Sequence, residues 1–154
     1  MGLSDGIKAE HFRAIGRIAV EFGELEKLLH SCICWTVGKD GDVAELIADE
    51  LGTFEKRVNF IGKVFKRKHS GAAWKSKFDD LMKSIKKVQS ERNALLHSVW
   101  LTNEANLAVI DQMTIKTEGP GARRRYSVQE LDGIADEINR INERFWHFIA
   151  NEFE

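Results

Sequence analysis

The sequence predicts an all-α fold, a helical bundle of about five helices with one small β-hairpin between the last two helices. Apolar residues recur every three or four positions through most of the chain, as in amphipathic helices, and alternate with polar residues only after Trp100. The chain has 154 residues, of which 43% are hydrophobic, and this size suits one domain with one core. We therefore expect a single domain over residues 1–154.

Three helices are expected in the first half of the chain. They run from about Ala9 to Val37, from Asp42 to about Leu51, and from Phe54 to Lys68. Gly52 ends the second helix, and Thr53 can cap the third. The residues expected to face the core are Phe12, Ile15, Ala19, Phe22, Leu25 or Leu29, Cys32 and Trp35, then Val43, Leu46 and Ile47, and then Phe54, Val58, Ile61 and Phe65.

The fourth helix is the most regular and is expected from about Ala73 to Trp100. Its apolar face contains Leu81, Ile85, Val88, Arg92, Leu95 and Val99. Arg92 therefore occupies a core position, where its permanent charge needs an anionic or carbonyl-rich partner. Asn93, His97 and Trp100 share a second face, which we expect to be covered as well.

A hairpin and a last helix complete the chain. Alternation at Leu107, Val109, Met113 and Ile115 predicts a strand or two, 118–121 a turn, and 123–126 the returning strand. Ser127 and Glu130 have the spacing of a capping box, which opens a helix. The residues expected to face inward on this helix are Leu131, Ile134, Ile138, Ile141, Phe145 and Phe148.

Basic residues are concentrated in the middle of the chain. The formal net charge is −1, so the molecule as a whole does not resemble a general polyanion binder. Between Glu55 and Arg92, however, twelve Lys and Arg stand against four acidic residues. This excess predicts a local surface for an anion or for RNA, and a solvated lysine-rich helix face is the alternative. The candidate RNA-binding residues are Lys83, Lys86, Lys87, Arg123, Arg124 and Arg125; for the three arginines, a solvated hairpin edge is the alternative.

Several classes of protein do not fit the sequence. No apolar run is long enough to span a bilayer and the N-terminus lacks the apolar core of a signal peptide, so we expect a cytoplasmic protein without a membrane partner. Cys32 and Cys34 point away from each other on a helix, which disfavours a disulfide or a zinc site. No phosphate-binding glycine loop, metalloprotease helix or nucleophile elbow is present, and we expect no cofactor and no metal.

The segment Arg92-Asn93-Ala94-Leu95-Leu96-His97 resembles the motif of the HEPN superfamily. The resemblance implies a compact helical domain, a homodimer and, in many members, a metal-independent endoribonuclease whose site combines residues of both protomers. It also implies a setting such as toxin–antitoxin pairs or phage defence, with an antitoxin or regulatory protein as a further partner. This chain departs from some toxin members, because no tyrosine cluster follows the motif. Arg140 and His147 also fit the motif's spacing of an arginine followed a few residues later by a histidine. We interpret these two as surface residues.

The resemblance assigns catalytic roles to Arg92, Asn93 and His97. Arginine matches phosphate oxygens with forked donors, and histidine exchanges protons near neutral pH, so Arg92 would hold the phosphate and His97 would act as acid or base. Asn93 would orient the site. We also expect Trp100 in the dimer interface, because it is a tryptophan on the face of the helix that lies away from the core row. The alternatives are a structural ion pair for Arg92, a packed helix histidine for His97, and a non-catalytic module that binds RNA or protein.

Overall fold

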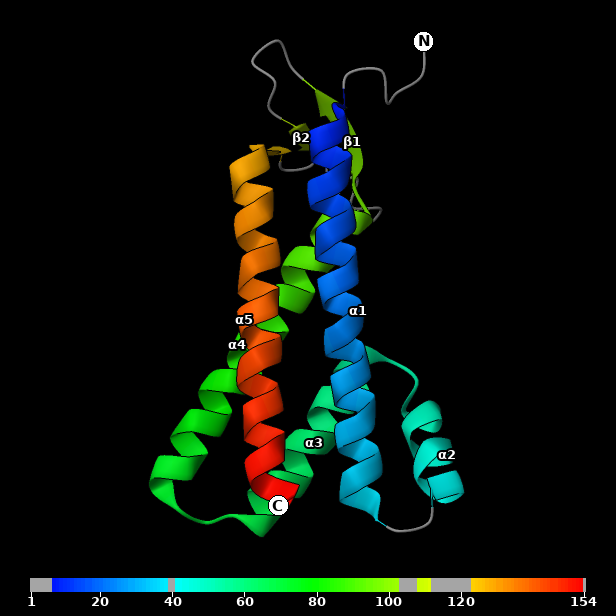
Figure 1. The fold of residues 1–154 in the computed structure, drawn as a ribbon, viewed down its shortest axis with the longest axis vertical. Helices are drawn as coiled ribbons and strands as arrows, with labels where there is room; N and C mark the ends of the chain where they lie inside the picture. The colour runs from blue at the N-terminus through cyan, green and yellow to red at the C-terminus, as the bar shows by residue number, and fades with distance from the viewer. Residues whose placement is uncertain (1–6, 39–40, 103–107, 112–122, 154) are drawn as a thin grey trace, which may run out of the picture. The chain divides into compact units, whose positions relative to one another are not determined.

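The structure is a computed structural model and describes residues 7–38, 41–102, 108–111 and 123–153. Within these ranges it contains five helices and three strands (Figure 1). The elements are α1 (Ala9–Val37), α2 (Gly41–Leu51), α3 (Phe54–Lys68), α4 (Ala72–Leu96), β1 (Val99–Thr102), β2 (Ala108–Asp111), β3 (Arg123–Tyr126) and α5 (Val128–Phe153). The predicted all-α fold with about five helices and a small β element before the last helix is confirmed.

The chain divides into two compact units. The first unit comprises Met1–Glu21 and Val88–Ile138, and the second comprises Phe22–Lys87 and Asn139–Glu154. The divisions fall inside α1, α4 and α5, so each of these helices contributes to both units. The single domain expected from the sequence stays a prediction.

The fourth helix ends at Leu96, four residues before the predicted end at Trp100. The Ser98 hydroxyl donates a hydrogen bond to the carbonyl of Ala94, and the Trp100 indole donates one of 2.9 Å to the carbonyl of Leu95. These bonds satisfy carbonyls that a continuing helix would have used. The prediction that His97, Val99 and Trp100 lie on the helix is therefore wrong.

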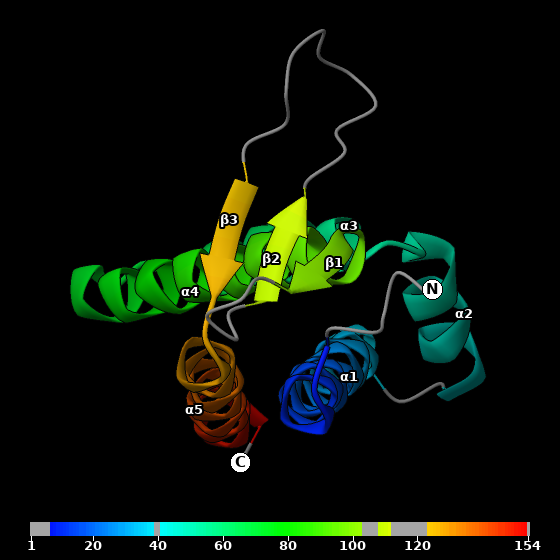
Figure 2. The ribbon, with the colours of Figure 1, turned by 90° about the horizontal axis from the view of Figure 1, so that it is seen from above.

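The β element is a three-stranded antiparallel sheet in the first unit, rather than a simple hairpin. Its strand order is β1-β2-β3, and Figure 2 shows β2 between the other two strands. Trp100 pairs with Ile110, and Val109 pairs with Arg125, as expected for the returning strand. The β-branched and aromatic residues after Leu96 suit a strand, and pairing with β2 stabilises it. The predicted strand positions Leu107, Met113 and Ile115, and the turn at 118–121, lie outside the described residues.

The first helix buries a different face from the predicted one over its first three turns. Phe12 is 54% exposed and Ala19 is exposed, whereas His11, Ala14 and Ile18 are fully buried. The predicted row and the buried row both have helical spacing. The buried row contains a histidine and an alanine, which are less hydrophobic than Phe12, so the pattern favoured the other row. From Phe22 onward the prediction holds at Phe22, Leu25, Leu29 and Cys32, but Trp35 is 44% exposed.

The second helix also turns a different face inward. Ala44 and Ala48 are buried, while Val43 and Leu46 are 46% and 62% exposed, contrary to the prediction. Small residues one turn apart let a helix approach its neighbour closely. A ranking of residues by hydrophobicity alone does not predict that alanines will be buried in preference to valine and leucine. Gly52, with φ +63°, ends α2 in the left-handed conformation.

The third and fifth helices match their predictions closely. Val58, Ile61 and Phe65 of α3 are buried, and the Thr53 hydroxyl accepts a hydrogen bond of 3.3 Å from the Lys56 N–H. In α5, five of the six expected core residues are buried; they are Leu131, Ile134, Ile138, Ile141 and Phe145. The buried polar Asn142 was not predicted.

A cluster of aromatic rings packs together in the second unit. Phe65, Trp74, Phe78 and Phe148 pack together with ring centroids 4.9–6.2 Å apart, and His69 stacks on Trp74 at 4.3 Å. These residues come from α3, α4 and α5 and the turn between α3 and α4, so the cluster joins the three helices. None of the helices in the described ranges combines the length and the apolar character needed to cross a membrane.

Candidate functional site

The end of α4 holds Arg92 and Asn93 in direct contact. The guanidinium Nη1 of Arg92 donates a hydrogen bond of 3.1 Å to Oδ1 of Asn93. Arg92 is half-buried, whereas Val88 and Leu95 on either side of it are fully buried. The predicted core position is therefore only partly correct, because the side chain reaches the surface. The charge of Arg92 was expected to need an anionic or carbonyl partner, and the amide oxygen of Asn93 is one such carbonyl.

His97 is the first residue after α4. Its backbone N–H donates a hydrogen bond of 3.1 Å to the carbonyl of Asn93, which continues the helical pattern by one residue. Its side chain is exposed, so the alternative of a packed helix histidine does not hold. Arg92, Asn93 and His97 thus occupy one turn and a half at a helix end, with the imidazole open to solvent.

Residues of the sheet lie next to this segment, and one of them, Tyr126, was not predicted as part of a site. Tyr126 of β3 is 2% exposed, its ring centroid lies 6.4 Å from that of Trp100, and the Arg124 guanidinium lies 4.6 Å above its ring. Burial raises the pKa of Tyr126, the charge of Arg124 opposes this shift, and that of Glu91 adds to it. Arg124 and Tyr126 are two apart on a strand and so share a face, a signal that the sequence does carry.

Trp100 is anchored within the chain. It is partly buried, hydrogen-bonded to Leu95 and packed near Tyr126. Its expected role in a dimer interface stays a prediction. Of the three arginines in β3, Arg124 and Arg125 are exposed, and the side chain of Arg123 lies outside what the structure describes.

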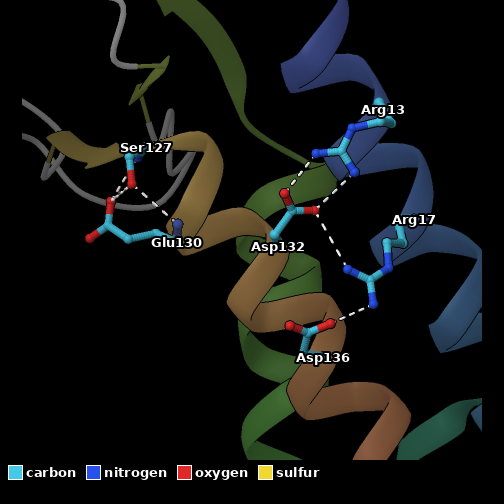
Figure 3. Close-up of polar contacts among 6 residues, drawn as sticks. All are labelled: Arg13, Arg17, Ser127, Glu130, Asp132 and Asp136. Carbon is cyan, nitrogen blue, oxygen red and sulfur yellow. Dashed lines mark hydrogen bonds and ion pairs between the residues drawn. The ribbon is translucent and has the colours of Figure 1, made fainter.

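Polar contacts fix the start of α5 directly after β3. The Ser127 N–H and hydroxyl both donate to Glu130 Oε2, and the Glu130 N–H donates to Ser127 Oγ at 3.1 Å, which confirms the predicted capping box (Figure 3). One turn further, Arg13 of α1 donates two hydrogen bonds to Asp132, and Arg17 bonds Asp136 (Figure 3). Both pairs advance by four residues, so these parts of α1 and α5 run side by side in the same direction within the first unit.

A second candidate surface is a basic groove between α3 and α4 in the second unit. Its volume is about 270 Å³, and Lys63, Lys66 and Lys86 line it above Phe78 and Met82. Lys86 donates a hydrogen bond of 3.2 Å to Asn59 Oδ1, and Lys66 forms an ion pair of 2.9 Å with Asp79.

Lysines surround Asp79, which is the carboxylate of this groove. The hydrogen bond from Lys66 and the charges of Lys66, Lys75 and Lys83 lower the pKa of Asp79, although burial opposes the shift. The groove contains Lys86 of the predicted RNA-binding set, and Lys83 lies near enough to act on Asp79. Lys87 is exposed on the same helix. Lys63 and Lys66 were not among the predicted RNA-binding residues, although their three-residue spacing on α3 places them on one face.

Metal ligands do not gather in the described residues, where no three His, Cys, Asp or Glu side chains lie close enough to hold an ion. Comparison with protein-family models, with curated proteins and with solved structures found no match. The HEPN resemblance therefore continues to rest on residues 92–97 and their context.

Proposed function

We propose that this protein is a HEPN-type endoribonuclease that cleaves RNA without a metal ion, with Arg92, Asn93 and His97 in its active site. The observation that carries the proposal is the arrangement at the end of α4, where an exposed imidazole follows a half-buried Arg92 hydrogen-bonded to Asn93. The backbone bond from His97 to Asn93 holds the three residues in one local structure.

The proposed reaction uses the 2′-hydroxyl of the RNA as nucleophile. A base removes the proton of this hydroxyl, the oxygen attacks the adjacent phosphorus, and the bond to the 5′-oxygen breaks as an acid protonates it. The products are a 2′,3′-cyclic phosphate and a free 5′-hydroxyl. Arg92 stabilises the charge that develops on the phosphoryl oxygens, and His97 transfers a proton. Asn93 holds the guanidinium by accepting its hydrogen bond.

Two histidines serve this reaction better than one, because a single imidazole cannot be base and acid at the same moment. We therefore propose a homodimer in which a second copy of the chain supplies the second His97. Size-exclusion chromatography with light scattering tests this at micromolar concentration. A strict monomer would contradict the composite site.

The test of cleavage compares the wild type with His97→Ala on a mixed-sequence single-stranded RNA in excess chelator. We expect cyclic-phosphate products from the wild type and a loss of about 10²-fold or more in His97→Ala, the usual contribution of a general acid or base. His147→Ala is the matched control, because His147 is also an exposed histidine and follows an arginine at a similar spacing. Equal cleavage by wild type and His97→Ala would contradict the assignment.

A non-catalytic RNA-binding module is the second candidate, and the basic groove between α3 and α4 favours it. If the wild type cleaves nothing but binds RNA with an affinity that falls steeply with salt, this function replaces the first. Lys63→Gln and Lys86→Gln should then each reduce the salt slope by about 0.7 for a single strand. Lys27→Gln, an exposed lysine of α1 outside the groove, should leave it unchanged.

A further inference from the structure

The second unit holds another cavity, between α4 and α5, that the proposed ribonuclease does not use. Its volume is about 370 Å³, within the range of small-molecule sites. Lys77, Asp80 and Leu81 of α4 face it from one side. The residues that face it from α5 are Arg144, His147, Phe148 and Asn151.

Charged groups of both signs surround the cavity, and the cations are in excess. Lys77 and Arg144 come from different helices, and among the described residues neither forms an ion pair. Asp80 supplies the carboxylate that lines the cavity, and it too forms no ion pair with another described residue. Two cations and one anion leave a positive charge, to which the His147 imidazole can add a hydrogen-bond donor. An anion entering the cavity therefore does not have to displace a carboxylate from either cation.

The floor of the cavity is apolar and held in place. Leu81 is 3% exposed, and Phe148 packs against Phe65, Trp74 and Phe78 with ring centroids 5.7, 5.5 and 5.3 Å away. Because Phe148 is half-buried and packed in this aromatic cluster, it can present a fixed apolar surface to a bound molecule. A cavity with an apolar floor and a cationic rim fits a molecule that carries one apolar and one anionic part.

We propose that the cavity between α4 and α5 binds a small organic anion, with its phosphate or carboxylate group between Lys77 and Arg144 and its apolar part on Leu81 and Phe148. The forked guanidinium of Arg144 matches either acid group, and Lys77 adds a second charge-assisted hydrogen bond. Asn151 supplies a neutral donor and acceptor at the rim.

The proposal is tested by titrating the full-length protein with four probes and following backbone amide shifts by NMR. The probes are phenyl phosphate, phenylacetate, inorganic phosphate and benzyl alcohol. We expect phenyl phosphate or phenylacetate to bind about tenfold more tightly than inorganic phosphate and benzyl alcohol, each of which offers only half of the required chemistry. Binding of either organic anion supports the proposal, and the tighter of the two identifies the acid group. Shift changes should concentrate at residues 77–81 and 144–151.

Four variants separate this site from general charge attraction. Lys77→Gln and Arg144→Gln should each weaken binding of the tighter organic anion by about tenfold or more, and Asp80→Asn should strengthen it. Lys75→Gln removes the same charge from the same helix outside the cavity lining and should change binding little. All four side chains are exposed, so the fold should persist, and circular dichroism verifies this. Equal losses in Lys75→Gln and Lys77→Gln, or inorganic phosphate binding as tightly as the organic anions, would overturn the proposal.

This inference does not depend on RNA cleavage. His97→Ala should bind the organic anion as the wild type does, so failure of one proposal leaves the other standing.

Discussion

The indole Nε1 of Trp100 donates a hydrogen bond of 2.9 Å to the carbonyl oxygen of Leu95, five residues earlier. This contact links the first strand to the end of α4, which carries Arg92 and is followed directly by His97. It gives the Leu95 carbonyl a partner where the helix has no further N–H to offer. Trp100, which the apolar pattern predicts to lie on α4, thus helps to end that helix.

Trp100→Phe should destabilise the protein by about 1 kcal/mol, because it keeps a ring beside Tyr126 but leaves the Leu95 carbonyl without its donor. Urea unfolding followed by circular dichroism measures the change. Trp146→Phe is the control, since Trp146 is 49% exposed and should tolerate the substitution. Equal stability of Trp100→Phe and wild type would mean that water replaces the indole at no cost.

Ser127→Ala should cost about 1 kcal/mol, the usual effect of removing a helix N-cap. The substitution removes the acceptor of the Glu130 N–H and one donor to the Glu130 carboxylate. Ser90→Ala, at an exposed position inside α4, serves as the control and should be neutral or slightly stabilising. A Ser127→Ala protein as stable as the Ser90→Ala protein would contradict the capping role.

Asp132→Asn should destabilise the protein at neutral pH and have little effect in acid. The hydrogen bonds from Arg13 are the largest cause that lowers the pKa of Asp132 in the folded state, and burial opposes it. The folded carboxyl therefore binds protons less readily than the unfolded one, whose pKa is about 3.9. Its stabilising contribution is complete above that value and is lost as the pH falls through the lowered folded pKa.

The measurement for Asp132 compares unfolding midpoints of wild type and Asp132→Asn at about pH 7 and about pH 2.5. The side chains of Arg13 and Asp132 are 56% and 28% exposed, so the difference at neutral pH should be small and should shrink in high salt. Glu143→Gln, at an exposed position of α5 outside the ion pairs of the described residues, is the control. A difference that does not change with pH would exclude the ion pair as its cause.

Phe78→Ala should destabilise the protein by about 3–5 kcal/mol, the range for removing a fully buried ring. Phe78 is completely buried and contacts Phe65, Trp74 and Phe148. Phe12→Ala removes the same atoms from a position that is 54% exposed and should cost about 1 kcal/mol or less. Thermal unfolding of the two variants measures both effects. Comparable losses would mean that Phe12 belongs to the core, as its place in the sequence pattern suggests.

Short-range features of this fold follow from the sequence alone. Thr53 caps α3, and Ser127 and Glu130 cap each other's N–H groups, because the partners are three residues apart and meet as soon as the helix turn forms. The apolar face of α5 was also predictable, since large residues occupy a single helical row. The candidate motif at residues 92–97 is local in the same sense, and its hydrogen bonds lie within one turn of α4.

Long-range contacts decided the rest. Two apolar rows compete on α1, and only tertiary packing selects the row with His11 and Ala14 over the row with Phe12. The end of α4 depends on pairing between β1 and β2, because the helical pattern by itself continues to Trp100. The basic groove likewise requires two successive helices to pack together, and the α4–α5 cavity requires side chains from helices far apart in the chain. Helical periodicity shows which residues share a face, but only the packed structure determines what that face meets.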